Sequence, residues 1–357
     1  MSDKNQYTPD VVSAPGATLL DLLSERGMSQ AELAARTGRP LKTINEIVKA
    51  KTAITSETAI QLERVLGVPA AFWNNREAQY RESLARVKER ASLERSLPRL
   101  KDVPTRAMEK LGWIMPERDR VKKLEQVFSF FGVATVEALE SRALDARFRR
   151  TAVFKTNPIA VGAWLRKGHL DADRIHCEPF DAAAFRGVLV EARRFCAEMP
   201  GDFAPRLVTL CASAGVAVVF VPELPGTHLS GAARWLSPAK ALIQLSARHK
   251  SDDHFWFTFF HEAAHILLHG RKRVFIDADE AESTDEEREA NVFASDALIP
   301  PREWQRFVAA SRYTKASIVR FATEVGVAPG VVVGRLQHEQ RLSFRFCNDL
   351  KRRISFA

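Results

Sequence analysis

The spacing of apolar residues over the first 73 positions predicts short helices separated by turns. Ser29 suits the start of the second helix, and Thr55 or Ser56 suits the start of the fourth, because side-chain oxygens cap free backbone N–H groups. Gly38 and Gly67 suit the turns that follow these helices. The expected helices are residues 17–25, 30–37, 41–50 and 57–66. Helices this close together leave no room for a sheet.

The pattern changes twice further along. Opposite charges alternate over residues 74–97, which is typical of a solvated helix. Residues 98–210 have a helical pattern interrupted by prolines and contain no recognisable catalytic or metal-binding motif. After residue 210, β-branched apolar runs predict strands at 216–221, 231–236 and 241–246.

A long apolar helix is expected at 251–269, with the Ser251 hydroxyl as its N-terminal cap. The carboxylates of Asp252 and Asp253 lie in its first turn, where negative charge interacts favourably with the helix dipole. Further helices are expected at residues 285–297, 302–310, 315–325 and 331–340. The fold class is therefore α+β and mainly helical. We expect a helical bundle over 1–75, a helical linker or support over 76–204, and a domain with a small sheet over 205–357.

Charge and cysteine use narrow the picture. Lys and Arg number 53 and Asp and Glu number 44, so the net charge is +9, which permits a nucleic-acid partner. The four cysteines are scattered without a C-x-x-C pair, which argues against a cysteine-ligated zinc site and against a disulfide scaffold. The N-terminus is polar and no apolar stretch approaches 18 residues, so we expect a cytoplasmic protein with no membrane span.

The strongest chemical signal is HEAAH, residues 261–265. On a helix, His261 and His265 share one face and can reach one metal ion. Glu262 lies beside the first of them and can take a proton from the attacking water. Two buried histidines inside the apolar run FWFTFFHEAAHILLHG need a reason to be there, and a metal supplies one.

A catalytic zinc needs a third protein ligand. Glu287 and Asn291 are four apart in DEEREANVFASDALIP, so the glutamate can bind the metal while the asparagine orients a ligating imidazole. Glu286 and Glu289 are competing ligands, although Glu286 would leave Asn291 on another face. The set suits one Zn²⁺ per chain and accepts Mn²⁺ or Fe²⁺.

The segment SQAELAARTGRPLKTINEIVKAKTAIT fits a helix-turn-helix, whose second helix enters the major groove. Lys42, Thr43 and Asn45 would face base edges. Gln30, Lys49 and Lys51 could hold phosphates. A helical bundle for protein contacts has the same pattern. Leu33, Ala34, Ile44 and Ile47 are the expected buried positions.

HEAAHILLH, followed about 20 residues later by EREANVFASDALIP, resembles the ImmA/IrrE family of metallopeptidases over roughly residues 205–345. The resemblance implies a zincin-like fold, with His261, His265 and Glu287 as zinc ligands and Glu262 as catalytic base. It also implies action on repressor-type protein partners. Ala264 stands where the family's HELGH form has glycine.

The run from SQAELAART to FWNN is similar to the XRE-type helix-turn-helix of HigA-like antitoxins over roughly residues 15–80. This implies binding of a palindromic operator as a homodimer, and a toxin as a further partner. Glu46 departs from the pattern, since an acidic group facing phosphates weakens binding.

Further roles follow from the expected mechanism. His338 and Tyr313 are candidates for stabilising the oxyanion. His269 is expected to interact with the C-terminus of its helix. A substrate peptide could add as a strand beside residues 241–246. A second helix–Gly–helix pattern at 315–339 could read DNA, but is expected to pack against the catalytic domain.

Two functions follow. The first is a zinc-dependent regulatory protease with its own DNA-binding domain, acting on a repressor, antitoxin or toxin in transcriptional control of a toxin–antitoxin, prophage or stress locus. The second is an antitoxin-like transcriptional repressor whose metallopeptidase-like domain senses a signal or partner without proteolysis. In a third version, the N-terminal domain of a protease captures a repressor or toxin. The intact Glu262 favours a protease, because a sensor does not need the base.

Overall fold

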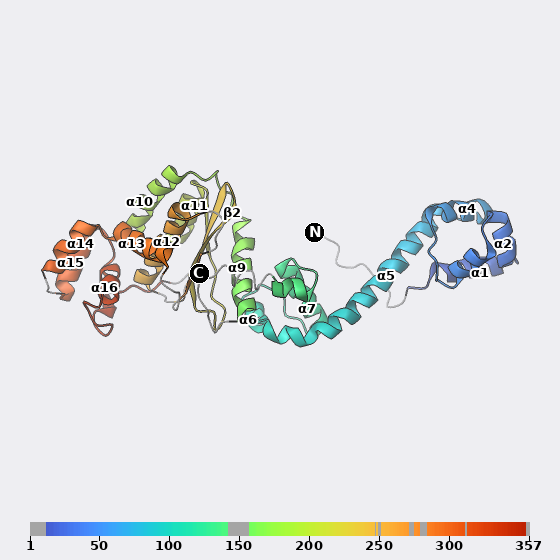
Figure 1. The fold of residues 1–357 in the computed structure, drawn as a ribbon, viewed down its shortest axis with the longest axis horizontal. Helices are drawn as coiled ribbons and strands as arrows, with labels where there is room; N and C mark the ends of the chain where they lie inside the picture. Colours follow the sequence, from blue (N-terminus) through green and yellow to red (C-terminus); the bar gives the residue numbers. More distant parts are fainter. Residues whose placement is uncertain are drawn as a thin grey trace. The chain divides into compact units, whose positions relative to one another are not determined.

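In a computed structural model, the chain folds into two compact units, residues 1–97 and 98–357 (Figure 1). The structure describes residues 12–141, 157–246, 248, 251–270, 275–278, 284–310 and 313–354. The fold class is α+β and mainly helical, as predicted, with one small sheet in the second unit.

The described part of the N-terminal unit is helical. Its helices are α1 (Pro15–Glu25), α2 (Gln30–Thr37), α3 (Leu41–Val48), α4 (Ser56–Leu66) and α5 (Ala70–Ser96). The four short helices predicted from the sequence are confirmed to within two residues at each end. The charged stretch is also a helix, but α5 runs for 27 residues, so the expected boundary after residue 75 falls inside it.

The predicted caps set these helix ends. The Ser29 hydroxyl accepts a hydrogen bond from the Glu32 N–H at 3.1 Å, and Thr55 accepts one from the Thr58 N–H. Gly38 and Gly67 follow their helices with φ of 68° and 66°, a left-handed backbone that favours glycine. Short polar motifs and glycines therefore determine where these helices begin and end.

One apolar core holds the bundle together. It includes the four buried positions expected from the sequence, and Trp73 in the first turns of α5 is fully buried in the same core. Gly16 of α1 lies so close to α3 that a Cβ there would come within 2.2 Å of the Ile47 carbonyl oxygen. These contacts fix the packing of α3, the predicted recognition helix.

The second unit begins with helices, as expected for the stretch broken by prolines. They are a 3₁₀ turn at Leu97–Asp102, α6 (Thr105–Lys110), α7 (Arg120–Phe131), α9 (Pro158–Ala172), α10 (Ala182–Glu198) and α11 (Phe203–Ala212). The Arg166 guanidinium donates to the Phe130 carbonyl at 2.9 Å, which ties α9 to the end of α7. The Asn157 amide donates to the Asp102 carbonyl at 2.6 Å.

Four strands form the sheet in the order β1-β3-β2-β4. They are β1 (Val216–Phe220), β2 (Leu229–Ser237), β3 (Lys240–Leu245) and β4 (Phe275–Ala278). β1 pairs parallel to β3, while β2 pairs antiparallel to both β3 and β4. The first three strands were predicted and the fourth was not. The expectation of peptide addition beside residues 241–246 is wrong, because β1 and β2 occupy both edges of β3.

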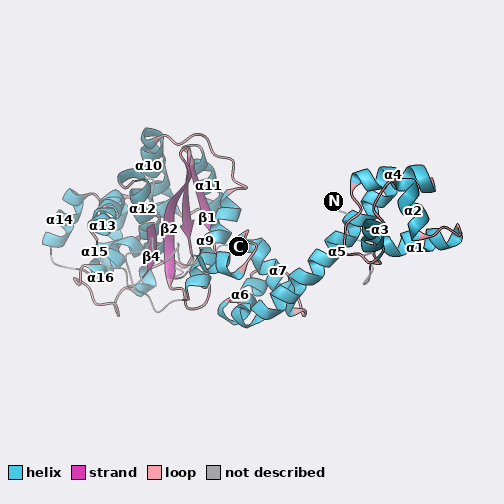
Figure 2. Cartoon of the chain, turned by 45° about the vertical axis from the view of Figure 1, so that its right-hand side comes forward, coloured by secondary structure: helices cyan, strands magenta, loops and turns pink. Residues whose placement is uncertain are grey.

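Helices cover both faces of this sheet (Figure 2). On one face lies α9, whose Trp164 indole donates to the Val221 carbonyl at 2.9 Å and whose Trp164 carbonyl accepts from Gln244 of β3. The other face carries the main core. The C-terminal helices that contribute to this core are α12 (Asp252–Leu268), α13 (Asp285–Leu298), α14 (Pro301–Ala309), α15 (Lys315–Val325) and α16 (Pro329–His338). Among these five helices, α12 packs against β2 and β3 of the sheet on one side and against α13 and α16 on the other.

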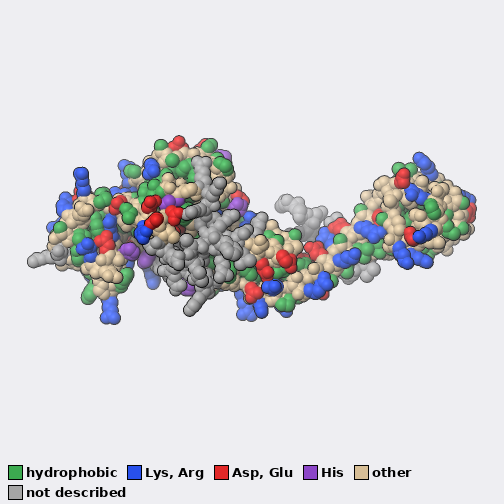
Figure 3. Space-filling view, viewed as in Figure 1, with side chains coloured by type: hydrophobic (Ala, Val, Ile, Leu, Met, Phe, Trp, Pro, Cys, Tyr) green, Lys and Arg blue, Asp and Glu red, His purple; other side chains and the backbone are tan. Residues whose placement is uncertain are grey.

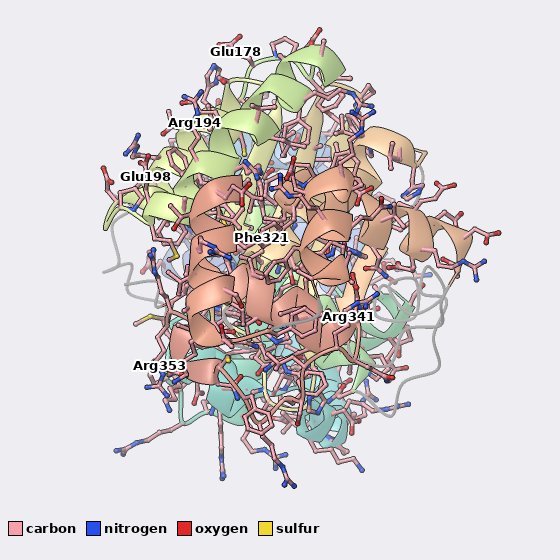
Figure 4. All side chains as sticks on the ribbon, turned by 90° about the vertical axis from the view of Figure 1, so that its left-hand side faces the viewer. Glu178, Arg194, Glu198, Phe321, Arg341 and Arg353 are labelled. Atoms are coloured by element: carbon pink, nitrogen blue, oxygen red, sulfur yellow. The ribbon has the colours of Figure 1, made fainter. Side chains whose placement is uncertain are left out.

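The helix–Gly–helix pattern at 315–339 packs against the rest of this domain, as expected. Phe321 of α15 is buried among the C-terminal helices and stacks on Phe307 of α14 at 4.1 Å between ring centroids (Figure 4). Among the described residues, no single helix is both long and apolar enough to cross a membrane. Only α15 and α16 together, which are bent by 112°, reach that length and composition.

The end of the chain holds the start of α12. Ser251 precedes the helix as predicted, but the expected hydroxyl cap is not formed. Instead, the Asp252 carboxylate accepts from the backbone N–H of Asp253 at 2.9 Å and of Arg352 at 3.1 Å. Lys351 pairs with Asp253 at 2.6 Å. Burial, and then the charge of Asp253, raise the pKa of Asp252 to about 6.

Two glycines of α16 make room for these carboxylates. A Cβ at Gly330 would come within 2.3 Å of Asp252 Oδ1, and one at Gly334 within 2.7 Å of Asp253 Oδ2. Asp252 is 0% exposed and Asp253 is 6% exposed. The N-terminus of α12 is therefore fixed by α16 and by the tail.

Candidate metal centre and nucleic-acid interface

His261 and His265 lie one turn apart on α12 and point the same way. Their Nε2 atoms are 3.0 Å apart, and the two residues are 3% and 1% exposed. Ala264 between them is fully buried, so the position that departs from the HELGH pattern lies in the core. The helix therefore presents two convergent imidazole nitrogens inside the protein.

Glu287 of α13 completes the cluster. Its Oε2 lies 3.1 Å from His261 Nε2 and its Oε1 lies 3.6 Å from His265 Nε2. Thr284 caps α13 by accepting from the Glu287 N–H at 3.2 Å, which fixes the first turn that carries this carboxylate. Among the described residues, the ligand atoms of these three side chains lie within 4.8 Å of one another. Neither Glu286 nor Glu289 belongs to this cluster.

The protonation states suit a divalent metal. Burial lowers the pKa of His265 to about 4, so its imidazole is neutral near pH 7. Burial alone would raise the pKa of Glu287, but contacts with His261 and His265 outweigh it and lower the pKa to about 2. A neutral imidazole and an ionised carboxylate are the forms that bind metal.

Asn291 supports the same conclusion. Its Oδ1, which can only accept, lies 3.0 Å from His261 Nδ1. A neutral His261 that donates this Nδ1–H has a lone pair at Nε2, and that lone pair faces the Glu287 carboxylate. In that tautomer the Nε2 lone pair and the Glu287 carboxylate converge on one point, so the donor set fits a metal ion such as zinc.

Glu262 is fully buried, and its side chain lies against β2. A Cβ at Gly231 would come within 2.5 Å of Glu262 Oε1 and 2.6 Å of the Thr258 methyl group. Gly231 thus makes the space that Glu262 occupies. Sequence reasoning missed this residue, although a glycine inside a strand is a known sign of close approach.

A second pair of side chains, not predicted from the sequence, adjoins His265. The His269 Nδ1 lies 2.9 Å from His265 Nδ1, and the His269 Nε2 lies 3.2 Å from Glu289 Oε2. Phe275 of β4 stacks on His265, with centroids 4.0 Å apart and planes at 12°. His269 is the C-cap residue of α12, as expected, with its backbone N–H donating to the His265 carbonyl at 3.2 Å, and its side chain also contacts a ligand histidine and α13.

The two oxyanion candidates lie outside this cluster. His338 is exposed in the last turn of α16, and its ring centroid lies 6.4 Å from that of Phe257, which in turn lies 6.2 Å from that of His261. The Tyr313 hydroxyl donates to the Val308 carbonyl at 3.3 Å. These contacts bring neither side chain to the three converging ligands.

In the N-terminal unit, α3 buries Ile44 and Ile47 and exposes Leu41 and Lys42. Lys42 is 85% exposed in its side chain, and Lys49 and Lys51 are also exposed. Among the other predicted DNA contacts, Gln30, Thr43 and Asn45 are half-buried.

Glu46 has partners inside the unit. It accepts from the Thr52 hydroxyl at 3.2 Å and lies 4.0 Å from Lys42. The carboxylate therefore braces the turn after α3 and partly neutralises a predicted DNA contact. Figure 3 shows Lys and Arg side chains on the face in view of this unit and along α5, interspersed with acidic ones.

Two families of known proteins match the regions of the chain that contain these residues. Residues 211–337 match the family described as Peptidase_M78, IrrE N-terminal-like domain, and residues 20–73 match the helix-turn-helix family. No curated protein matches the chain.

Solved structures that are similar to part of the chain include antidote and antitoxin proteins. An addiction module antidote protein of the HigA family from Coxiella burnetii is 27% identical, with a TM-score of 0.22, over 24% of this chain and 92% of that one. The Pseudomonas aeruginosa antitoxin HigA with the higBA promoter is 29% identical, with a TM-score of 0.23, over 24% and 94%. The chain is therefore similar to helix-turn-helix proteins over residues 20–73 and to the IrrE-like Peptidase_M78 family over residues 211–337.

Proposed function

We propose that this chain is a zinc-dependent regulatory protease that carries its own DNA-binding domain. The observation that carries the proposal is the convergence of His261, His265 and Glu287 beside Glu262. The match to the IrrE-like metallopeptidase family supports it. The substrate is a repressor, antitoxin or toxin protein rather than protein in general.

In this mechanism, two histidines and one glutamate hold the metal, and their partners keep them in the metal-binding form. A bound zinc would supply Lewis-acid polarisation of the scissile carbonyl and make water more acidic. Glu262 takes the proton of the attacking water and passes it to the nitrogen of the leaving amine. Its burial against Gly231 excludes bulk water from that proton transfer.

The open edge of the sheet suggests where a substrate lies. β4 pairs with β2 on one side, and no other described strand pairs with it on the other. Phe275 of β4 contacts His265, so an extended peptide added beside β4 would pass the metal ligands. We therefore assign to β4 the substrate pairing first expected at β3.

The N-terminal domain is proposed to bind operator DNA through α3. The exposed Lys42 and the half-buried Thr43 and Asn45 lie on the helix that enters the major groove in helix-turn-helix proteins. Lys49 and Lys51 follow at its end and suit phosphate contacts. A homodimer would place two such helices on a palindromic site.

The test compares the full-length wild type with Glu262→Gln. Bound metal is quantified in each, and each is incubated with repressor-type and toxin proteins encoded beside its gene. We expect both to bind about one zinc and only the wild type to cut one of these partners. If zinc binds and neither cuts, the alternative stands, in which the domain is a sensor within an antitoxin-like repressor.

A further inference from the structure

The contacts of His269 suggest a role that the metal ligands alone do not give. This imidazole is 6% exposed in its side chain and lies between His265 on its own helix and Glu289 on α13. Glu289 is 64% exposed, so one end of this three-residue chain reaches solvent and the other ends at a buried ligand. Phe275 covers both rings, with its centroid 4.0 Å from His265 and 5.3 Å from His269.

When both imidazoles are neutral, the hydrogen bonds along this chain have one consistent direction. An ionised carboxylate can only accept, so His269 donates its Nε2–H to Glu289. A neutral His269 then has a lone pair at Nδ1, which accepts the Nδ1–H of His265 at 2.9 Å. His265 is left with its lone pair at Nε2, the atom that faces His261 and Glu287.

His261 obtains the same result from Asn291. Helix α13 therefore supplies Glu287 as a ligand and, two and four residues later, Glu289 and Asn291 as the groups that set both histidines. The difference is that Asn291 contacts His261 directly and so selects its tautomer, whereas Glu289 acts on the tautomer of His265 through His269.

We propose that His269 and Glu289 are positioning residues that select the metal-binding tautomer of His265 and fix the orientation of its ring. The proposal rests on the metal centre of the proposed function. It adds to that centre a relay of two side chains, neither of which touches the metal.

Zinc affinity of the full chain, measured by competition with a chromogenic chelator, tests the relay without any substrate. His269→Phe keeps the ring volume and removes the acceptor, and we expect it to weaken zinc binding about ten- to a hundredfold. His269→Asn retains an acceptor oxygen and should recover part of that loss. Glu289→Gln, which can still accept, should bind more tightly than Glu289→Ala. His176→Phe, at an exposed histidine, is the matched control.

A second measurement reads the tautomers of the metal-free protein. In two-bond ¹H–¹⁵N spectra of histidine-labelled protein, His269 should carry its proton on Nε2 and His265 on Nδ1. Glu289→Ala should shift His269 toward the other tautomer. Equal zinc affinity in wild type and His269→Phe, or His265 protonated on Nε2, would overturn the relay and leave the metal centre standing. Failure of the wild type to bind zinc would remove both.

Discussion

Gly231 and Glu262 are complementary: the missing side chain of the strand residue is the space that the helix carboxylate fills. A Cβ at position 231 would lie 2.5 Å from Glu262 Oε1, closer than any normal contact. Gly231→Ala is therefore expected to displace the carboxylate and to lower kcat by about a hundredfold, since small misplacements of catalytic groups are costly.

Zinc content should be unchanged in that variant, because Glu262 is not one of the three converging ligands. Gly187→Ala is the matched control, since a Cβ there meets nothing within 4 Å. A Gly231→Ala protein that is well folded and fully active would refute the assignment of Glu262 as the base.

Metal binding should stabilise the second unit and leave the first unchanged. Free zinc at about 1,000 times its Kd adds about 4 kcal/mol to the free energy of unfolding. We expect a chelator to lower the Tm of the transition that includes α12, and Glu287→Ala to abolish the zinc-dependent increase. Calorimetry measures both transitions. A zinc-dependent increase that survives in Glu287→Ala would show that the metal binds elsewhere.

Asp252 predicts a pH dependence of stability. Its pKa is raised to about 6 in the folded state from an ordinary value near 3.8, so the folded protein binds the proton more tightly than the unfolded chain. The stability from this protonation is fully present below about pH 4 and is lost as the pH rises through 6. The loss at neutral pH is on the order of 3 kcal/mol.

Asp252→Asn should therefore stabilise the protein at pH 7 and have little effect at pH 4. Chemical denaturation at both pH values measures the difference in the free energy of unfolding. Asp202→Asn, at an exposed aspartate after α10, is the control. A variant that is destabilised at pH 7 would mean that the ionised carboxylate is the favoured form.

Glu46 is expected to limit DNA binding. Glu46→Gln removes a negative charge near the phosphates and frees Lys42 from a partner 4.0 Å away, so affinity should rise several-fold at low salt. Lys49→Ala should lower the slope of log affinity against log salt by about 0.9. Titrations by fluorescence anisotropy measure both, with Glu82→Gln on α5 as control. Unchanged affinity in Glu46→Gln would mean that α3 does not face the DNA.

The residues that could be predicted are those linked by helical spacing. His261 and His265 are four apart, and so are Glu287 and Asn291, so each pair shares a face whatever the tertiary structure. The caps at Ser29 and Thr55 each join a hydroxyl to the backbone N–H three residues later, so they too are local in the sequence. Such local rules account for most of the helix boundaries.

The features that could not be predicted depend on contacts between distant segments. The partners of His269 come from its own helix and from α13, and nothing in the sequence spacing links it to Glu289. β4 is four residues long and has no distinctive pattern, so the strand that pairs with β2 at the edge of the sheet was not predicted. One of the hydrogen bonds to Asp252 comes from Arg352, which is 100 positions away.

The tail that secures α12 bears on how this domain can be isolated. The family match ends at residue 337, but Lys351 and Arg352, which contact the first turn of α12, lie beyond it. The match also begins at 211, after α9, which covers the opposite face of the sheet. A fragment cut at the limits of the match would expose apolar strand surface and leave Asp253 without its lysine. The smallest autonomous folding unit is therefore larger than the region of family similarity.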